Sequence, residues 1–319
     1  MIPQEQQLLV TSSPHAHSPD SVPNAMRDVL IALCPALFAA LYFFRLSALL
    51  VIIACILSAY LAEMVCLRVM KKDSSTKESS AIVTGLLLAF CVPPTLPLWM
   101  AALGAIFAVV IAKHLFGGLG QNIFNPALIG RAFLLASFPV AMTTWTNPID
   151  GLTTASPLGI MKEATGAALP TLSQLFFGTV SGSIGETSAL AILLGGAYLL
   201  YRKQIDWRIP GAFLGTVFLL TAIIGTIKGL GIWYPLFHLC AGGLLLGAFF
   251  MATDWVTSPI TRSGRIIFGV GCGLLVVLIR LKGGYPEGVA YSILLMNIVT
   301  PLIDRYTKAR VFGRVGRHA

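Results

Sequence analysis

The stretch GLLLAF at residues 85–90 returns as GLLLGAF at residues 243–249, and this recurrence decides the predicted fold. A second pair of stretches, VVIAKHLFGG at 109–118 and VVLIRLKGG at 276–284, is similar once one gap is allowed. Both pairs are separated by about 160 residues, which indicates that the chain consists of two related units.

The composition places these stretches in a membrane. Of the 319 residues, 56% are hydrophobic and only 11% are charged, which is too little charge to cover a water-soluble globule. The formal net charge of +9 does not indicate nucleic acid, because basic residues in a membrane chain mark its cytoplasmic loops. We therefore predict an integral membrane protein with no nucleic-acid partner.

The fold class follows from counting apolar stretches that can cross a bilayer, each of about 20 residues. We predict an all-α integral membrane protein with about ten transmembrane helices, arranged as two five-helix repeats. Because five is odd, the second repeat is inverted relative to the first, which places a binding site or pathway between the repeats. The predicted spans are about 27–44, 46–67, 80–93, 97–115, 125–141, 187–202, 209–227, 235–253, 265–281 and 287–304.

Basic residues orient the chain. If the N-terminus is cytoplasmic, five of the 22 Lys and Arg residues fall outside, and the other 17 fall inside. This asymmetry predicts that both termini lie in the cytoplasm and that the protein is a multi-pass protein of the cell's inner membrane. The five outside are Arg45, Lys162, Lys228, Arg280 and Lys282.

Five segments result from this topology. Residues 1–25 contain no apolar signal-peptide region, so we expect a cytoplasmic tail and a first helix that acts as its own insertion signal. Between the repeats lies an outward-facing loop that is long enough to be functional. The segments are the tail 1–25, the first repeat 26–145, the loop 146–186, the second repeat 187–304 and a basic cytoplasmic tail 305–319.

Hydroxyl groups gather in this loop, in the stretch DGLTTASPLG at residues 150–159. Ser156 precedes a proline, which favours an extended backbone that displays the hydroxyl. Ala155 is small enough for a planar group to approach, and Asp150 and Thr153 supply hydrogen-bonding groups. The residues alone fit an ordinary polar loop equally well.

The pattern Asp-x-x-Thr-x-Ala-Ser in this stretch resembles a flavinylation motif, in which a flavin transferase joins the last hydroxyl to the phosphate of FMN. The resemblance implies that Ser156 carries FMN as a phosphoester and that Asp150 and Thr153 are motif positions. Thr154 stands where the motif usually has Gly, and Ser156 stands where Thr is common.

Nearly the whole chain resembles one family, which contains the RnfD component of Rnf ion-translocating electron-transport complexes and the NqrB component of sodium-pumping NADH:quinone reductases. The resemblance implies a flavin-carrying subunit of an ion-translocating oxidoreductase complex, inactive alone. That complex would couple electron transfer between ferredoxin and NAD(H) to Na⁺ or H⁺ transport. The stretches that carry the resemblance are SSPH at 12–15, MRDVL at 26–30, GQNIFNPA at 120–127 and FMATD at 250–254.

Two alternatives remain open at this point. The chain could be the NqrB-like component of a sodium-pumping quinone reductase, although it lacks a long charged N-terminal extension. It could also be a small-solute permease, because inverted repeats with broken helices build transporters as well. A purified permease would be colourless, whereas a flavin protein would be yellow.

A second, non-covalent flavin such as riboflavin is also implied by the resemblance. Asn122 and Asn125 lie at the start of the fifth predicted span, where their amides could bind such a ring. Alternatively, Asn125 caps the helix that begins at Pro126.

Charged residues at the ends of spans are candidates for an ion path. Glu63 and Asp254 lie where acids are costly, which suggests an ion path or neutralisation by a nearby Lys or Arg. Arg131 could pair with one of these acids or extend toward the interface. His114 and His238 lack metal-ligand spacing, so we predict neither a metal site nor a catalytic residue.

The cysteines show no C-x-x-C pairing, and we expect them to pack between helices. They are Cys34, Cys55, Cys66, Cys91, Cys240 and Cys272.

Overall fold

The computed structural model describes residues 21–71, 79–148, 150–163 and 169–308. Most of the predicted N-terminal and C-terminal tails therefore lies outside the described residues. The described part is mostly helical, with one short two-stranded sheet.

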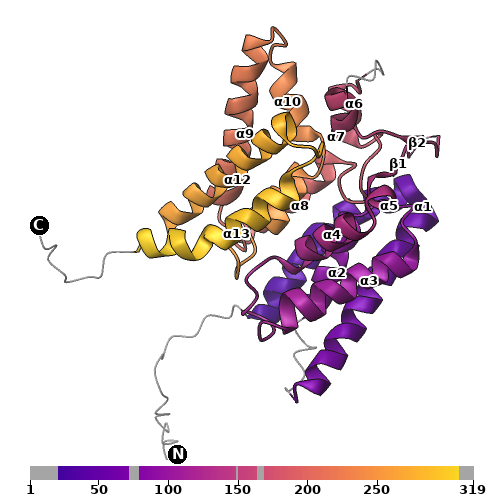
Figure 1. The fold of residues 1–319 in the computed structure, drawn as a ribbon, viewed down its shortest axis with the longest axis vertical. Coiled ribbons are helices and arrows are strands. Elements are labelled where there is room, and N and C mark those ends of the chain that lie inside the picture. The colour runs from indigo at the N-terminus through magenta and orange to yellow at the C-terminus, as the bar shows by residue number, and fades with distance from the viewer. Residues whose placement is uncertain (1–20, 72–78, 149, 164–168, 309–319) are drawn as a thin grey trace, which may run out of the picture.

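The first half of the chain forms one group of helices (Figure 1). Its elements are α1 (Val22–Val69), α2 (Ser80–Phe90), α3 (Leu98–Val109), the π-helical turn η2 (Val110–His114), α4 (Pro126–Ser137) and α5 (Pro139–Thr143). Helix α1 is interrupted at Arg45, whose φ of 50° and ψ of −127° are not helical. The interruption lies between the predicted spans 27–44 and 46–67.

A connection with little regular structure follows. It contains the strands β1 (Trp145–Thr146) and β2 (Thr153–Thr154) and the helices α6 (Pro157–Glu163) and α7 (Leu172–Phe177). The loop predicted at 146–186 thus holds two short helices and most of a hairpin.

The second half forms another group of helices (Figure 1). Its elements are α8 (Ala189–Tyr201), α9 (Arg208–Ile227), α10 (Trp233–Cys240), α11 (Leu244–Leu246), the π-helical turn η3 (Gly247–Met251), α12 (Arg262–Lys282) and α13 (Val289–Tyr306). Helix α10 and the segment Leu244–Met251 meet at an angle of 65°, so this stretch is a broken helix.

Each of the ten predicted apolar stretches contains a helix. By length and apolarity, three helices of the described chain can each cross a membrane, namely α1, α9 and α12, and the broken pair raises this number to four. The described chain is thus a mostly helical protein with membrane-spanning segments.

Close approach of helices builds the core. The two halves share one continuous cluster of buried apolar side chains, which runs from α1 to α13. Gly195 of α8 faces the Ala32 carbonyl of α1, where an added Cβ would lie only 2.0 Å from the oxygen. A Cβ added at Gly273 of α12 would similarly meet the Phe213 carbonyl of α9 at 3.0 Å. Small residues at such crossings let backbones pack tightly, as is typical of membrane helices.

A buried acid also joins the two halves. Asp28 near the start of α1 accepts hydrogen bonds from the side chains of Tyr198, Arg202 and Gln204 at 3.2, 3.1 and 2.9 Å. These contacts bring the beginning of α1 and the end of α8 to the same end of the molecule.

Candidate functional site

The predicted motif lies on a hairpin. Strands β1 and β2 pair antiparallel, with Thr146 opposite Thr153. Asp150 lies in the connecting turn, where its carboxylate is 3.4 Å from the Asn147 amide nitrogen. Asp150 and Thr153 are both exposed, so the motif positions around the acceptor can be reached from outside.

Ser156 follows this hairpin, directly before helix α6. Its hydroxyl accepts a hydrogen bond from the Gly159 backbone nitrogen at 3.2 Å, so the side chain also caps the helix. A Cβ at Gly159 would lie 3.3 Å from the Ser156 hydroxyl, closer than most such contacts. The glycine therefore leaves room around the only side-chain atom of Ser156 that can form an ester.

A pocket of about 360 Å³ opens directly beside Ser156. Aromatic side chains from two parts of the chain contribute to its wall, Trp145 from β1 and Tyr285 and Tyr291 from around the start of α13. Arg131 of α4 supplies a buried positive charge in the same wall. The volume falls within the range of small-molecule and cofactor sites.

Lys162 holds the two sides of this pocket together. Its ammonium donates to the backbone carbonyls of Gly283 and Tyr285, the latter at 2.8 Å. The contact ties α6 to the connection between α12 and α13. It also provides a donor for a carbonyl just beyond the C-terminus of α12, where backbone acceptors have no partner within the helix.

The buried Arg280 and the partly buried Glu287 bind backbone groups that have no helical partner at the break between α10 and α11. Arg280 of α12 donates to the carbonyls of His238 and Ala241 at 2.6 and 3.0 Å, at the end of α10. Glu287 accepts a hydrogen bond from the Gly243 backbone nitrogen at 2.6 Å, just before α11. A cation at a helix C-terminus and an acid at an N-terminus both oppose the exposed backbone dipoles.

Arg131 links this break to the first half of the chain. It pairs with Glu287 and, at 3.4 Å, with Glu186, so the interpretation that Arg131 pairs with Glu63 or Asp254 is wrong. Burial raises the pKa of the Glu186 carboxyl, and the nearby Glu287 carboxylate raises it further. The guanidinium between the two acids gives each of them a partner, without which a buried charge would be strongly destabilising.

Glu186, Glu287 and Arg280 are site residues that the sequence pattern does not predict. Each is an isolated charge beside an apolar stretch, and nothing in the sequence gives its partner. The adjacent glycines Gly242 and Gly243 are the one sequence signal for the break that these residues surround, since Gly242 adopts a φ of +72° that ends the helix.

Asn122, Asn125 and Asp254 come together at a second pocket of about 370 Å³. Its lining is mainly apolar and includes Phe249 and the buried Lys113. The structure therefore brings three of the predicted residues to one cavity, whose lining does not include Ser156.

The two asparagines differ in what their amides do. The Asn125 side chain accepts from the Ala127 and Leu128 backbone nitrogens at 3.0 and 3.4 Å, which makes it the cap of α4. Its amide nitrogen donates to the Met251 carbonyl at 3.2 Å. The Asn122 amide nitrogen donates to the Phe124 carbonyl at 3.0 Å. Both the oxygen and the nitrogen of the Asn125 amide make contacts within the protein. Asn122 is therefore the better candidate for a ligand contact.

The two predicted acids have different surroundings. Glu63 is buried and pairs with Lys113, whose ammonium also donates to the Ser80 hydroxyl at 2.6 Å. Glu63 thus has a lysine that neutralises it, and this pair leaves the ion-path interpretation of Glu63 untested. Asp254 accepts from the Thr257 hydroxyl at 3.1 Å, and burial raises the pKa of its carboxyl.

Helix α12 sets the separation between the two pockets. Lys162, beside Ser156, contacts Gly283 at the C-terminal end of α12. Trp255, in the wall of the second pocket, lies in the connection that leads to the N-terminal end of α12. With 21 residues at a rise of 1.5 Å per residue, α12 is about 32 Å long. The two pockets therefore lie at opposite ends of a helix that matches a bilayer core.

Histidines and cysteines of the described residues do not form a metal cluster. No group of three or more His, Cys, Asp or Glu side chains in this part of the chain could hold a metal ion. The six cysteines are all free thiols. Cys55, Cys91 and Cys272 are buried, and the other three are partly exposed.

Comparison with known proteins places the chain in a family. The family described as NQR2, RnfD, RnfE matches residues 9–313. In Clostridium ljungdahlii, the D component of the proton-translocating ferredoxin:NAD(+) oxidoreductase complex is 50% identical over 95% of this chain and 96% of its own length. The D component of the Na(+)-translocating ferredoxin:NAD(+) oxidoreductase complex of Acetobacterium woodii is 47% identical over 97% of this chain and 96% of its own length. The D component of the ion-translocating oxidoreductase complex of Aliivibrio salmonicida is 40% identical over 95% of this chain and 98% of its own length. The chain belongs to the NQR2, RnfD, RnfE family.

Proposed function

We propose that this chain is the flavin-carrying membrane subunit of an Rnf-type complex that couples electron transfer between ferredoxin and NAD(H) to ion transport. The names of the relatives from Clostridium ljungdahlii and Acetobacterium woodii support the reaction, and the near-complete coverage of both chains supports the transfer to this protein. One of these names specifies protons and the other sodium ions, so the proposal includes either ion. The chain acts with the other subunits and not alone.

The observation that carries this proposal is the position of Ser156 at the edge of the 360 Å³ pocket. We assign FMN to Ser156 as a phosphoester, with the flavin ring in this pocket. The space beside Gly159 suits the bulk of a phosphoester, and the aromatic wall suits a planar ring. The exposed hairpin with Asp150 and Thr153 is accessible to a flavin transferase.

A bound flavin exchanges one or two electrons, and the protein fixes its position and potential. Ser156 anchors the group at the start of α6, and Lys162 keeps α6 against the α12–α13 connection. Arg131 and Glu287 contribute an ion pair to the wall, so the charge of Arg131 is already balanced there. The rings of Trp145 and Tyr285 offer flat apolar surfaces in the wall of the pocket.

The second pocket is proposed to hold a non-covalent flavin such as riboflavin. Its mainly apolar lining and its volume of about 370 Å³ fit a flavin ring, and Asn122 and Lys113 supply polar contacts. Asp254 and the Glu63–Lys113 pair lie at or beside this pocket, and we assign Glu63 and Asp254 to the ion path. The burial of Glu63 and the raised pKa of the Asp254 carboxyl support this assignment.

Placement in the membrane completes the proposal. We propose ten spans in two inverted repeats in the cell's inner membrane, with both termini in the cytoplasm. The presence of a helix in each predicted stretch agrees with this topology. The FMN pocket then faces outward and the second pocket faces the cytoplasm. Their location at opposite ends of α12 supports this arrangement.

Mass spectrometry of the purified chain tests the proposed cofactor. Proteolysis should release one peptide that contains Ser156 and carries the mass of FMN less one water. An unmodified Ser156 peptide at full yield, from a complex active in electron transfer, would contradict the proposal. Ion uptake into vesicles that hold the complex, measured with and without Na⁺, then distinguishes sodium from proton transport.

A further inference from the structure

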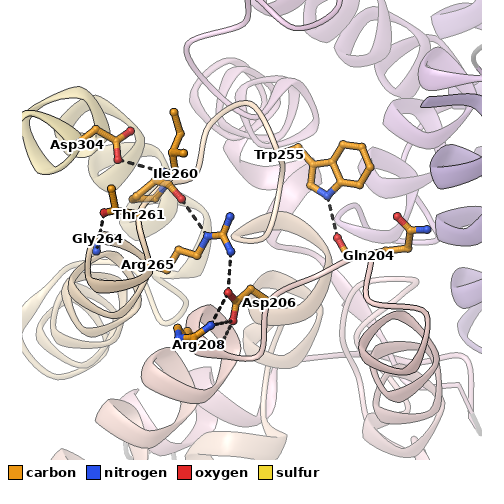
Figure 2. A network of polar contacts seen from close by, with 10 residues as sticks. Gln204, Asp206, Arg208, Trp255, Ile260, Thr261, Gly264, Arg265 and Asp304 are labelled. Carbon is orange, nitrogen blue, oxygen red and sulfur yellow. Dashed lines mark hydrogen bonds and ion pairs between the residues drawn. The ribbon is translucent and has the colours of Figure 1, made fainter. Parts of the chain in front are cut away.

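A third cavity, of about 780 Å³, opens at the N-terminal ends of α9 and α12. Its walls are the connection 202–207 between α8 and α9 and the connection 252–261 between η3 and α12. The Trp255 indole nitrogen donates to the Gln204 carbonyl at 2.8 Å, which joins the two connections (Figure 2).

Positive charge exceeds negative charge around this cavity. Lys203, Arg208 and Arg265 contribute to its lining, and Asp206 is the one acid among the described lining residues. Figure 2 shows Asp206 between the two arginines, which donate to its carboxylate at 2.9 and 2.6 Å. One acid cannot neutralise three cations, so the cavity keeps an excess of about two positive charges and is complementary to an anion.

The two guanidinium groups are fixed before any ligand arrives. Asp206 engages one terminal nitrogen of Arg208 and one of Arg265. The Arg265 Nε donates in addition to the Pro259 carbonyl at 3.1 Å. Within the described residues, the second terminal nitrogen of each arginine remains available. Such preorganised donors suit a phosphate group.

Large apolar side chains surround the same opening. Trp207 is 64% exposed and Ile260 is 80% exposed, and both line the cavity. On α12, the exposed Ile266 and Ile267 follow Arg265 directly. Tryptophans at the ends of membrane helices are typical of the lipid–water interface. The cavity therefore combines a cationic interior with an apolar rim that continues along a membrane helix.

We propose that this cavity binds the headgroup of an anionic phospholipid. The phosphate contacts Lys203, Arg208 and Arg265, and the acyl chains lie along the apolar surface that begins at Ile260 and continues on α12. An anionic lipid can bind both the positive charges and the exposed apolar rim, whereas a free anion would bind only the positive charges. The proposal does not depend on either flavin.

Native mass spectrometry of the delipidated complex tests this site. Phosphatidylglycerol and phosphatidylcholine with identical acyl chains are added together, and the ratio of bound lipids gives the ratio of their dissociation constants. The wild-type complex should prefer phosphatidylglycerol. Lys203→Gln should reduce this preference about fivefold, the effect of one basic residue near an anionic headgroup. Lys203→Arg should restore it.

Lys228→Gln is the matched control, because Lys228 is an exposed lysine at the opposite end of α9. It should leave the lipid preference unchanged, and an equal effect of the two glutamine variants would contradict a specific site. Displacement of phosphatidylglycerol by an equal concentration of inorganic phosphate would contradict the role of the acyl chains. Preference in the isolated chain that disappears in the whole complex would show that another protein of the complex covers this cavity and would overturn the proposal.

Discussion

Arg131 and Glu287, which lie 156 positions apart in the sequence, form a largely buried ion pair that joins the two halves of the chain. Glu287 also accepts from the Gly243 nitrogen, so the pair connects α4 to the break between α10 and α11. A charge from the first half thus stabilises an irregular backbone in the second. This arrangement positions the pocket beside Ser156, because Arg131 and Glu287 both contribute to its lining.

Arg131→Met should destabilise the protein strongly. The substitution leaves the buried Glu186 and the partly buried Glu287 without their cation, and removing one member of a buried pair typically costs about 3–5 kcal/mol. Thermal unfolding of the detergent-purified chain measures the effect. The double variant Arg131→Met with Glu287→Gln should recover part of the lost stability, and an Arg131→Met protein as stable as wild type would show that the pair is not required.

Asn122→Leu should reduce the amount of non-covalent flavin, with some loss of stability because the side chain also donates to the Phe124 carbonyl. The Asn122 amide lies at the second pocket, and leucine removes its polar contact while keeping a similar volume. Acid extraction followed by chromatography measures the released riboflavin. Asn125→Ala provides the contrast, because it removes the cap of α4 and should cost about 1 kcal/mol of stability. Wild-type riboflavin content in Asn122→Leu would exclude this amide from the site.

Acid should weaken the contacts around Asp206 in a defined pH range. Burial disfavours the charged form, but hydrogen bonds from Arg208 and Arg265 outweigh it and hold the pKa of Asp206 below its usual range. A lowered folded-state pKa gives stabilisation that is complete above the unfolded-state value near 4 and is lost as the pH falls through the folded-state value. Melting temperatures measured from pH 6 downward should therefore fall less steeply for Asp206→Asn than for wild type. Identical slopes would mean that Asp206 has the same pKa in both states.

Reporter fusions test the membrane orientation. A reporter that is active only outside the cytoplasm should be active when fused after Leu169, in the connection between the repeats. The same reporter fused after Lys308 should be inactive, because we place the end of α13 in the cytoplasm. Activity of both fusions, or of neither, would contradict the ten-span topology and the inverted repeat.

Helices are predictable from this sequence, whereas most side-chain contacts between helices are not. Apolar stretches and proline-started helices have local signals, so the positions of α4, α9 and α12 can be expected from residues near each helix. The break at Gly242–Gly243 also has a local signal. Ion pairs such as Arg131–Glu287 depend on which distant helices become neighbours, and a single sequence does not contain that information.

The candidate residues show the same division. The prediction that Asn125 caps a helix is confirmed, because a cap is a local arrangement before a proline. Ser156 has the same local signal, because it precedes Pro157, but the seven residues of α6 are too few to show a helical period. The convergence of Asn122 and Asp254 on one pocket depends on the tertiary fold.

Attachment of FMN at Ser156 is the central claim, and in-gel flavin fluorescence of a denatured substitution series tests it most directly. Ser156→Thr keeps a hydroxyl and should retain the fluorescence, whereas Ser156→Ala should lose it. Because Ser156 also caps α6, Ser156→Asn is the decisive variant, since asparagine is a good helix cap but cannot form a phosphoester. Loss of fluorescence in Ser156→Asn, with wild-type thermal stability, is the result that we predict. Fluorescence at the wild-type level in Ser156→Asn would contradict the attachment site.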